Sequence, residues 1–448
     1  MDKSKLQLME SAPIYTAIMK LAVPTVLSMV VQVLYNLTDT FFIGQLNDPV
    51  QVAGVTVALP ITMMQMALAG IFGNGGGSYV SRLLGAKRLD DAKSTVSTSI
   101  ATSFALSIFV AIVGTLLAPN LISWSGASSA SYKYALHYVQ ILLICSPIPM
   151  LNFALSQLLR SEGAAKAAMN GMIVGTIVNI VLDPIFIFVF KMGVSGAAVA
   201  TVLGNAVGVV MYLLHYYKGH SPVRPAIRYI SLRKDIYLEI FKIGIPSSVS
   251  QIMMSIGSSF AYKLASSYSD NAVAAMGVSM RIFSIPTFVF LGIAIGIQAL
   301  IGYNYGARLY QRMRETIYKA LLINLGLSAL GIFFFALFPG ALIKIFISDA
   351  EVVELGTMIL RSYIWAIPFA ASGMIFMMTL QATGKSFPSL IVALSRQGIV
   401  FIPALIILNS LFGFKGLVFA LPVADAITVA ISSSFVAALI AKTKTKQY

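Results

Sequence analysis

Charged residues are scarce in this sequence. They make up 10% of its 448 residues, whereas about 25% is usual for a soluble domain, and 58% of the chain is hydrophobic. Apolar runs such as 21–37, 171–182 and 398–408 recur along it, and with their weakly polar flanks many reach the ~20 residues that cross a bilayer. The composition excludes a soluble globular fold and predicts an all-α integral membrane protein.

Residues that bind metals or carry out catalysis are also few. Cys145 is the only cysteine, which excludes an internal disulfide or a cysteine metal cluster, and the three histidines have no ligand spacing. Gly384-Lys385-Ser386 resembles the end of a nucleotide-binding loop, but Thr379 stands where that loop requires glycine. The sequence therefore predicts no enzyme and no cofactor.

The net charge of +15 is explained by membrane topology. With both termini on the inner side, the inner loops and tails hold 21 Lys and Arg and the outer loops hold five, as the positive-inside rule expects. Nucleic-acid binding is excluded, because it requires a basic surface on a soluble module. Hydropathy predicts about twelve helices, near residues 16–46, 51–81, 94–118, 131–159, 165–190, 194–217, 237–265, 271–302, 316–339, 353–381, 387–409 and 415–441.

The two halves of the chain repeat each other at an offset of about 221 residues. Residues 18–24 align with 240–246, and the register holds across glycines, prolines and basic loops over six helices. Each unit has an even number of helices, so both enter the membrane in the same sense, as parallel repeats do. We predict an N-terminal lobe (1–217), a basic connector on the cytoplasmic side (218–236) and a C-terminal lobe (237–448), with the binding site between the lobes.

Buried acidic residues lie mainly in the N-terminal half. An ionised carboxylate at membrane depth costs at least ~2.5 kcal/mol. The presence of Asp39, Asp183 and Asp425 inside predicted helices therefore indicates a functional or structural role for each of them. Two of them have polar neighbours at helical spacing. One face of the first helix carries Gln32, Tyr35, Asn36 and Asp39, and one face of the fifth carries Met172, Asn179 and Asp183. Further residues suited to the same site are Ala197, Thr201 and Asn205 on the sixth helix and Asn152 on the fourth.

Such a cluster suits a sodium ion or a proton equally, because paired carboxylates in a desolvated site favour proton uptake. The alternative is that these groups only hydrogen-bond neighbouring helices together. A structural role for Asp425 is equally open, and Arg396 is a candidate counter-ion for it, while Arg281 is a candidate for lining a cleft. Tyr138 and methionines such as Met253 suit contacts with lipophilic cations of many shapes.

The sequence resembles the multidrug and toxic compound extrusion (MATE) family over essentially its whole length. Residues 34–44 look like the first-helix signature of that family, and residues 179–183 are similar to its fifth-helix cation motif. The match is to the DinF-like branch, whose coupling site lies in the N-terminal lobe. The resemblance implies a cation site at Asp39, Asn179, Asp183 and Thr201, with Asn152 beside it, and drug contacts at Gln32, Tyr35 and Met172.

The family resemblance implies a secondary active antiporter that exports cationic or amphipathic small molecules in exchange for protons or sodium by alternating access. The alternative is a flippase of lipid-linked precursors from the same superfamily. We expect a multi-pass protein of the cell membrane with both termini cytoplasmic, acting as a monomer. Its expected partners are the lipid bilayer and small organic cations or drugs, with no nucleic acid.

Overall fold

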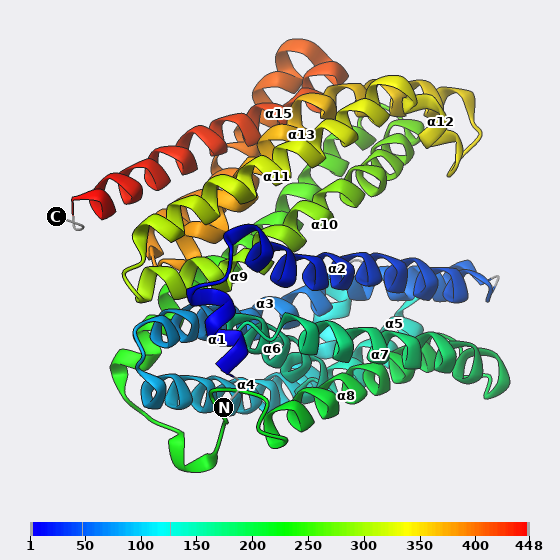
Figure 1. Cartoon of the computed structure of the whole chain (residues 1–448). Helices are drawn as coiled ribbons and strands as arrows, with labels where there is room; N and C mark the ends of the chain where they lie inside the picture. The colour runs from blue at the N-terminus through cyan, green and yellow to red at the C-terminus, as the bar shows by residue number, and fades with distance from the viewer. Residues whose placement is uncertain (1–2, 47, 126, 446–448) are drawn as a thin grey trace. The chain divides into compact units, whose positions relative to one another are not determined.

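The structure is a computed structural model, and it describes residues 3–46, 48–125 and 127–445. Throughout these ranges the regular secondary structure is helical, with no strand (Figure 1). The described part of the chain therefore confirms the all-α prediction.

The first half of the chain begins with a short helix and continues through long ones. Its elements are α1 (Lys3–Glu10), α2 (Ile14–Gly44), α3 (Pro49–Gly85), α4 (Leu89–Trp124), α5 (Tyr132–Ile144), α6 (Pro147–Ser161), α7 (Ala165–Pro184), the π-helical η1 (Ile185–Val189) and α8 (Val194–Tyr217). A connector with a 3-10 turn, η2 (Ile227–Tyr229), leads to the second half.

The second half repeats the pattern of long helices. Its elements are α9 (Lys234–Ser266), α10 (Asp270–Gly306), α11 (Tyr310–Leu337), α12 (Pro339–Lys344), α13 (Ala350–Ala382), α14 (Ser386–Leu394), the π-helical η3 (Ser395–Ile399) and α15 (Phe401–Lys444). Gly413 has a non-helical backbone (φ 60°, ψ −142°), so α15 consists of two helices joined at a kink.

About twelve membrane helices result, as the sequence predicts. Nine described helical segments are long and apolar enough to span a bilayer, and the α5–α6 pair, bent by 55°, adds a tenth. One of the nine is the 59-residue segment Ser386–Lys444, which the kink at Gly413 divides. Helix α9 corresponds to the predicted seventh helix but is less apolar, because serines and Gln251 interrupt its hydrophobic residues.

Two details differ from the predicted helices. The single helix expected at 131–159 is broken between Ile144 and Pro147, because proline lacks an N–H and clashes with the preceding turn. The predicted break between the last two helices, at residues 409–415, is a single kink at Gly413 inside a continuous helical segment. Glycine alone tolerates this backbone conformation without strain.

The chain forms two compact units. Unit 1 contains Met1–Ser11 and Leu27–Ser248, and unit 2 contains Ala12–Val26 and Val249–Tyr448. Both α2 and α9 therefore contribute one end to each unit. The lobe boundaries at 217 and 237 stay predictions from the sequence.

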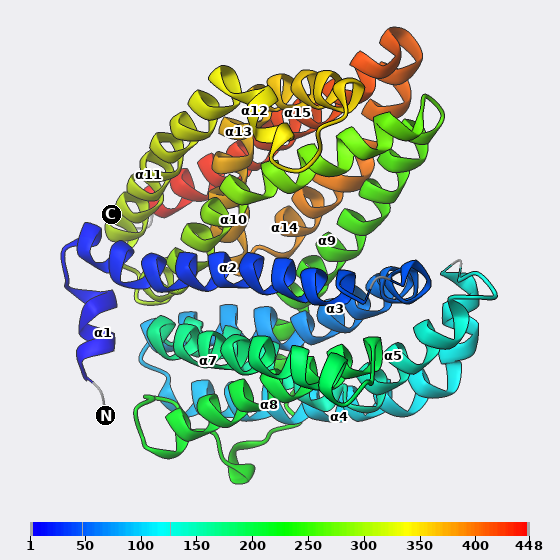
Figure 2. The ribbon, with the colours of Figure 1, turned by 90° about the vertical axis from the view of Figure 1, so that its right-hand side faces the viewer.

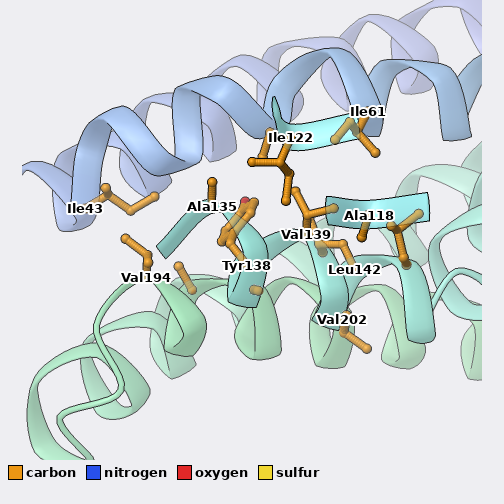
Figure 3. Packing of buried hydrophobic residues seen from close by; sticks show 14 of the residues in the cluster. Ile43, Ile61, Ala118, Ile122, Ala135, Tyr138, Val139, Leu142, Val194 and Val202 are labelled. Carbon is orange, nitrogen blue, oxygen red and sulfur yellow. The ribbon is translucent and has the colours of Figure 1, made fainter. Parts of the chain in front are cut away.

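Unit 1 has a hydrophobic core built from α2, α3, α4, α5 and α8. Figure 3 shows part of it, including Ile43 of α2, Ile61 of α3, Ile122 of α4, Tyr138 of α5 and Val202 of α8. At the α2–α3 loop, Asp48 caps α3, and Oε1 of the Gln51 side chain on that helix accepts a hydrogen bond from the backbone N–H of Val194 at 3.3 Å. This bond ties the start of α3 to the start of α8.

Unit 2 is organised around α10, α11, α13 and α15, which run side by side in both views (Figures 1 and 2). Asn324 of α11 donates a hydrogen bond to the Ala371 carbonyl oxygen of α13 at 3.0 Å. Glycines permit close approach on α10, where a Cβ at Gly296 would lie 2.5 Å from Cα of Ala22 on α2. Small residues and interhelical hydrogen bonds thus hold this unit together, as is usual in a membrane.

Candidate functional site

The polar face of α2 meets α8 inside unit 1. The Tyr35 hydroxyl lies 3.1 Å from the Thr201 hydroxyl, so the two share a hydrogen bond. Asp39 stands one turn beyond Tyr35, on the same face. Sequence reasoning placed Asp39 and Thr201 in one site, and this contact brings their helices together.

The second acidic residue lies at the end of α7. Asp183 is fully buried and accepts a hydrogen bond through Oδ1 from the Asn179 amide, 3.3 Å away on the preceding turn. Pro184 follows directly, and the chain then passes into the π-helical turn Ile185–Val189. Such turns are frequent at functional sites, because they aim side chains in directions that a regular helix does not.

Glycines on α7 and α8 allow this acid to approach its neighbours. A Cβ at Gly204 would lie 2.6 Å from the Gly175 carbonyl oxygen and 2.9 Å from Cβ of Asn179. Any side chain there would separate α7 from α8 and displace Asn179. The signal for this crossing is present in the sequence, since glycines are spaced by four residues on both helices, at 171 and 175 and at 204 and 208.

Amide side chains complete the cluster. The Asn152 side-chain amide of α6 donates to Oδ1 of Asn205 at 2.6 Å, and the Asn205 side-chain amide donates to the Thr201 backbone oxygen at 2.8 Å. Asn205 lies on the predicted sixth helix but is not among the residues predicted for the cation site. The structure shows it as the link between Asn152 and Thr201.

Four side-chain oxygens of this cluster are buried without a hydrogen-bond partner in the described structure: Oδ1 of Asp39, Oδ1 of Asn152, Oδ1 of Asn179 and Oδ2 of Asp183. Asp39 and Asp183 also lie within electrostatic range of each other. Buried polar groups are normally paired, and an unpaired one costs about 1–3 kcal/mol. We refer to these residues, together with Tyr35, Thr201 and Asn205, as the carboxylate–amide cluster.

The donor set of this cluster suits a small hard cation or a proton. Carboxylate and carbonyl oxygens are the ligands that hard cations prefer, and two nearby carboxylates at membrane depth bind a shared proton readily. No group of three or more His, Cys, Asp or Glu residues suited to a metal occurs in the described ranges. The cluster offers two acids, Asp39 and Asp183, together with amide and hydroxyl oxygens.

The remaining predicted contact residues lie in varied surroundings. Tyr138 is 7% exposed within the core of Figure 3, yet it lies within electrostatic range of Asp39 and Asp183. Ala197 is fully buried in the same core. Gln32 and Met172 are half-buried and Asn36 is exposed.

Met253 belongs to unit 2, where its Sδ would lie 3.2 Å from a Cβ at Gly398. The binding roles of these residues stay predictions.

Unit 2 holds an ion pair in place of a second acid cluster. Arg396 Nε lies 2.9 Å from Asp425 Oδ1, and Asp425 is 2% exposed. Arg396 is therefore the counter-ion of Asp425, which the sequence left open. Arg281 is exposed on α10 and lies within electrostatic range of Tyr262. The two units thus differ in charge: the described acids of the cluster in unit 1 have no basic partner, whereas Asp425 has one.

Comparison with known proteins gives matches along both halves of the chain. A family model described as MatE matches residues 24–185 and again 246–407, so its two matches begin 222 residues apart. Multidrug export protein MepA of Staphylococcus aureus (strain MRSA252) is 31% identical over 429 residues, covering 95% of this chain and 94% of its own. The MepA protein of Staphylococcus saprophyticus is 30% identical over 427 residues, with the same coverage.

Solved structures agree over the whole chain. An outward-facing multidrug resistance MATE family transporter of the MOP superfamily has a TM-score of 0.93 and 27% identity, covering 98% of both chains. A MOP superfamily transporter from Pyrococcus furiosus has a TM-score of 0.92 and 27% identity, again covering 98% of both.

The duplicated helical fold with a polar cluster at membrane depth defines a multi-pass membrane transporter, and not an enzyme. The chain belongs to the MatE family, which confirms the resemblance seen in the sequence. The paired matches also confirm the internal duplication.

Proposed function

We propose that this protein is a secondary active antiporter that exports cationic or amphipathic small molecules in exchange for protons or sodium. The observation that carries the proposal is the carboxylate–amide cluster, with four buried oxygens of Asp39, Asn152, Asn179 and Asp183 directed to no protein donor among the described residues. A monovalent cation bound there satisfies these oxygens and neutralises charge that is otherwise expensive at membrane depth.

Coupling follows from competition for the same negative charge. A bound proton or sodium ion removes the electrostatic attraction for a cationic cargo, and release of the ion restores it. Exchange requires that the cluster bind the ion with different affinity in two conformations, since a ligand shifts a conformational equilibrium only through differential binding. Asp183 lies beside Pro184 and a π-helical turn, which are sites where α7 bends readily.

The cargo class is supported by the relatives and by the side chains near the cluster. The MepA proteins are named as multidrug export proteins. On α2, Tyr35 and Gln32 share a face with Asp39, and Met172 precedes Asn179 by two turns of α7. Aromatic faces attract organic cations, and flexible thioethers adapt to cargo of different shapes.

The topology proposed for this function places both termini and the basic loops on the cytoplasmic side. The loops that follow α3 and α8 carry Lys87, Arg88, Lys218, Arg224 and Arg228, which the positive-inside rule assigns to the cytoplasm. The carboxylate–amide cluster lies within unit 1, so one copy of the chain supplies the whole ion site. We accordingly propose that the monomer is the transporting unit.

The test is export of a fluorescent organic cation from cells that produce Asp39→Asn. An amide cannot take up and release a proton or hold a cation as a carboxylate does, so efflux falls to the background of cells without the protein, at unchanged protein level in the membrane. The matched control is Asp48→Asn, which removes an acid at the N-cap of α3. Efflux by Asp39→Asn equal to that of the control contradicts the proposal.

A further inference from the structure

The connector between α8 and α9 has an unusual composition. Residues 218–235 contain five basic residues and one acid, Asp235. Aliphatic residues are interleaved with the charges, at Ile227, Ile230 and Leu232. Topology explains the charges through the positive-inside rule, but it does not explain aliphatic side chains in a loop that lies outside the spanning helices.

The connector is fixed against α4 by its backbone. The Ser231 N–H donates to the Thr98 hydroxyl at 3.0 Å, and the Ala226 N–H donates to the Ser97 hydroxyl at 3.1 Å. Figure 2 shows this segment as a strap between α8 and α9, in contact with α4 through η2. Its side chains therefore point in defined directions.

Arg233 and Val223 anchor the two ends of the strap. Arg233 forms an ion pair with Asp91 of α4 at 2.9 Å, and with Asp235 at 2.5 Å. Val223 is fully buried. These inward contacts leave the segment between them, 224–232, to present the remaining side chains outward.

The outward side chains are aliphatic and basic. Ile227 is 87% exposed and Leu232 is 85% exposed, although the same strap buries Val223 completely. Arg224 lies over the ring of Tyr217 at 5.5 Å, and Arg228 lies over the ring of Tyr229 at 4.9 Å. Arg228 also donates through Nη2 to the Tyr229 hydroxyl at 3.2 Å. Because a guanidinium has five N–H donors, the other N–H groups of both arginines remain available to bind an anion.

The length of α8 indicates where the strap lies relative to a bilayer. Helix α8 has 24 residues and is roughly 36 Å long at 1.5 Å per residue, which exceeds a hydrocarbon core of about 30 Å. Its last residue, Tyr217, therefore reaches the interface, where tyrosine is enriched. The strap begins at the next residue.

We propose that residues 224–232 form a docking surface for an anionic phospholipid leaflet. Arg224 and Arg228 bind headgroup phosphates, while Ile227 and Leu232 insert between the headgroups into the acyl region. An interfacial segment binds in this way through apolar area together with electrostatic attraction, and each basic residue near an anionic surface strengthens binding roughly fivefold. The phosphate backbone of a nucleic acid would satisfy the charges but leave the aliphatic side chains in water.

The test places a fluorescent reporter at the proposed point of insertion. Ile227→Trp is made in a background of Trp124→Phe and Trp365→Phe, which removes both native tryptophans. The full-length protein is reconstituted into vesicles whose acyl chains carry bromine, with either phosphatidylglycerol or only phosphatidylcholine. Bromine quenches an indole that lies among the acyl chains, so the readout does not depend on transport.

The proposal predicts blue-shifted emission and strong quenching at position 227 in phosphatidylglycerol vesicles, with at least about threefold less quenching in phosphatidylcholine. Arg224→Gln with Arg228→Gln abolishes the difference between the two vesicles. The matched control, Lys87→Gln with Arg308→Gln, removes the same amount of charge from two other exposed loop positions. It is expected to leave the difference in quenching between the two kinds of vesicle unchanged. Water-like emission in both vesicles, or quenching independent of phosphatidylglycerol, overturns the proposal.

Discussion

At the scale of single residues, the two lobes of a duplicated fold carry different charge chemistry. Asp39 and Asp183 each retain a buried oxygen without a protein partner among the described residues, whereas Asp425 pairs with Arg396 at 2.9 Å. An acid with a fixed counter-ion is poorly suited to take up and release a cation. Ion exchange is therefore proposed for unit 1 alone.

Asp183→Asn tests the second acid of the cluster. Because Asp183 and Asp39 interact electrostatically, loss of either charge weakens ion binding. Export is expected to fall roughly tenfold, which corresponds to a loss of about 1.4 kcal/mol in the free energy of ion binding. Initial rates of dye efflux from cells, normalised to protein in the membrane, provide the measurement. Wild-type rates in Asp183→Asn would remove this residue from the ion site.

Asp425→Asn is expected to affect stability more than transport. The variant leaves Arg396 without its charged partner, and breaking such a pair costs about 3 kcal/mol where both groups are buried, less here because Arg396 is 23% exposed. The thermal unfolding midpoint in detergent therefore drops, and the added change Arg396→Gln restores part of it. Loss of export equal to that of Asp39→Asn, with stability unchanged, would assign Asp425 to ion coupling.

The Tyr35–Thr201 hydrogen bond is expected to be worth about 0.6 kcal/mol, the usual size of an interhelical hydrogen bond in a membrane. Tyr35→Phe and Thr201→Val should each lower the free energy of unfolding slightly. The double variant should be as stable as the less stable of the two single variants, because either change alone already removes the hydrogen bond. A double-mutant cycle from unfolding in detergent measures this coupling. Fully additive effects would show that the two hydroxyls do not interact.

At the scale of elements, the crossing of α7 and α8 positions the ion site. Gly175 and Gly204 approach so closely that a Cβ on either would lie 2.6 Å from the other's carbonyl oxygen. Real Cβ atoms do not lie this near to backbone, so a substitution moves one helix. Asn179 lies at this crossing, and Asp183 follows it by one turn.

Gly204→Ala should therefore reduce both stability and export by displacing Asn179. The matched control is Gly326→Ala on α11, where an added Cβ meets nothing within 4 Å and replaces a weak helix former. Unfolding midpoints and efflux rates of the two variants are compared. Equal behaviour of the two variants would show that the close crossing does not position the site.

Sequence patterns predict helices well here because a membrane helix needs only a sufficiently long apolar run. The predicted bounds of 194–217 coincide with α8 (Val194–Tyr217). The break at Pro147 was missed because proline is tolerated inside many membrane helices, including α2, where Pro24 leaves the helix continuous. Whether a proline breaks its helix depends on neighbouring helices that can satisfy the freed backbone groups.

The candidate site was predictable where helical spacing alone decides, as for Asn179 and Asp183 on one face of α7. Contacts between helices could be suggested from the sequence but not decided. Arg396 was only a candidate counter-ion of Asp425, 29 residues away, and the Asn152–Asn205 bond, which joins residues 53 apart, was not predicted. Such pairs depend on helix rotation and crossing, which a single sequence does not determine.

At the scale of the whole molecule, two copies of a six-helix unit form one transporter, and the family matches at 24–185 and 246–407 show both copies. Duplication supplies two similar frameworks, and the substitution of single residues then makes them chemically unequal. The central claim is that the copy containing Asp39 and Asp183 couples export to a monovalent cation.

The most direct test reconstitutes the protein in liposomes and follows a fluorescent organic cation while a proton gradient or a sodium gradient is imposed separately. The proposal predicts that at least one gradient drives uphill movement of the cation, and that Asp39→Asn abolishes this movement while Asp48→Asn preserves it. Movement of the organic cation that is independent of both gradients would contradict the proposal, and so would uphill transport by Asp39→Asn.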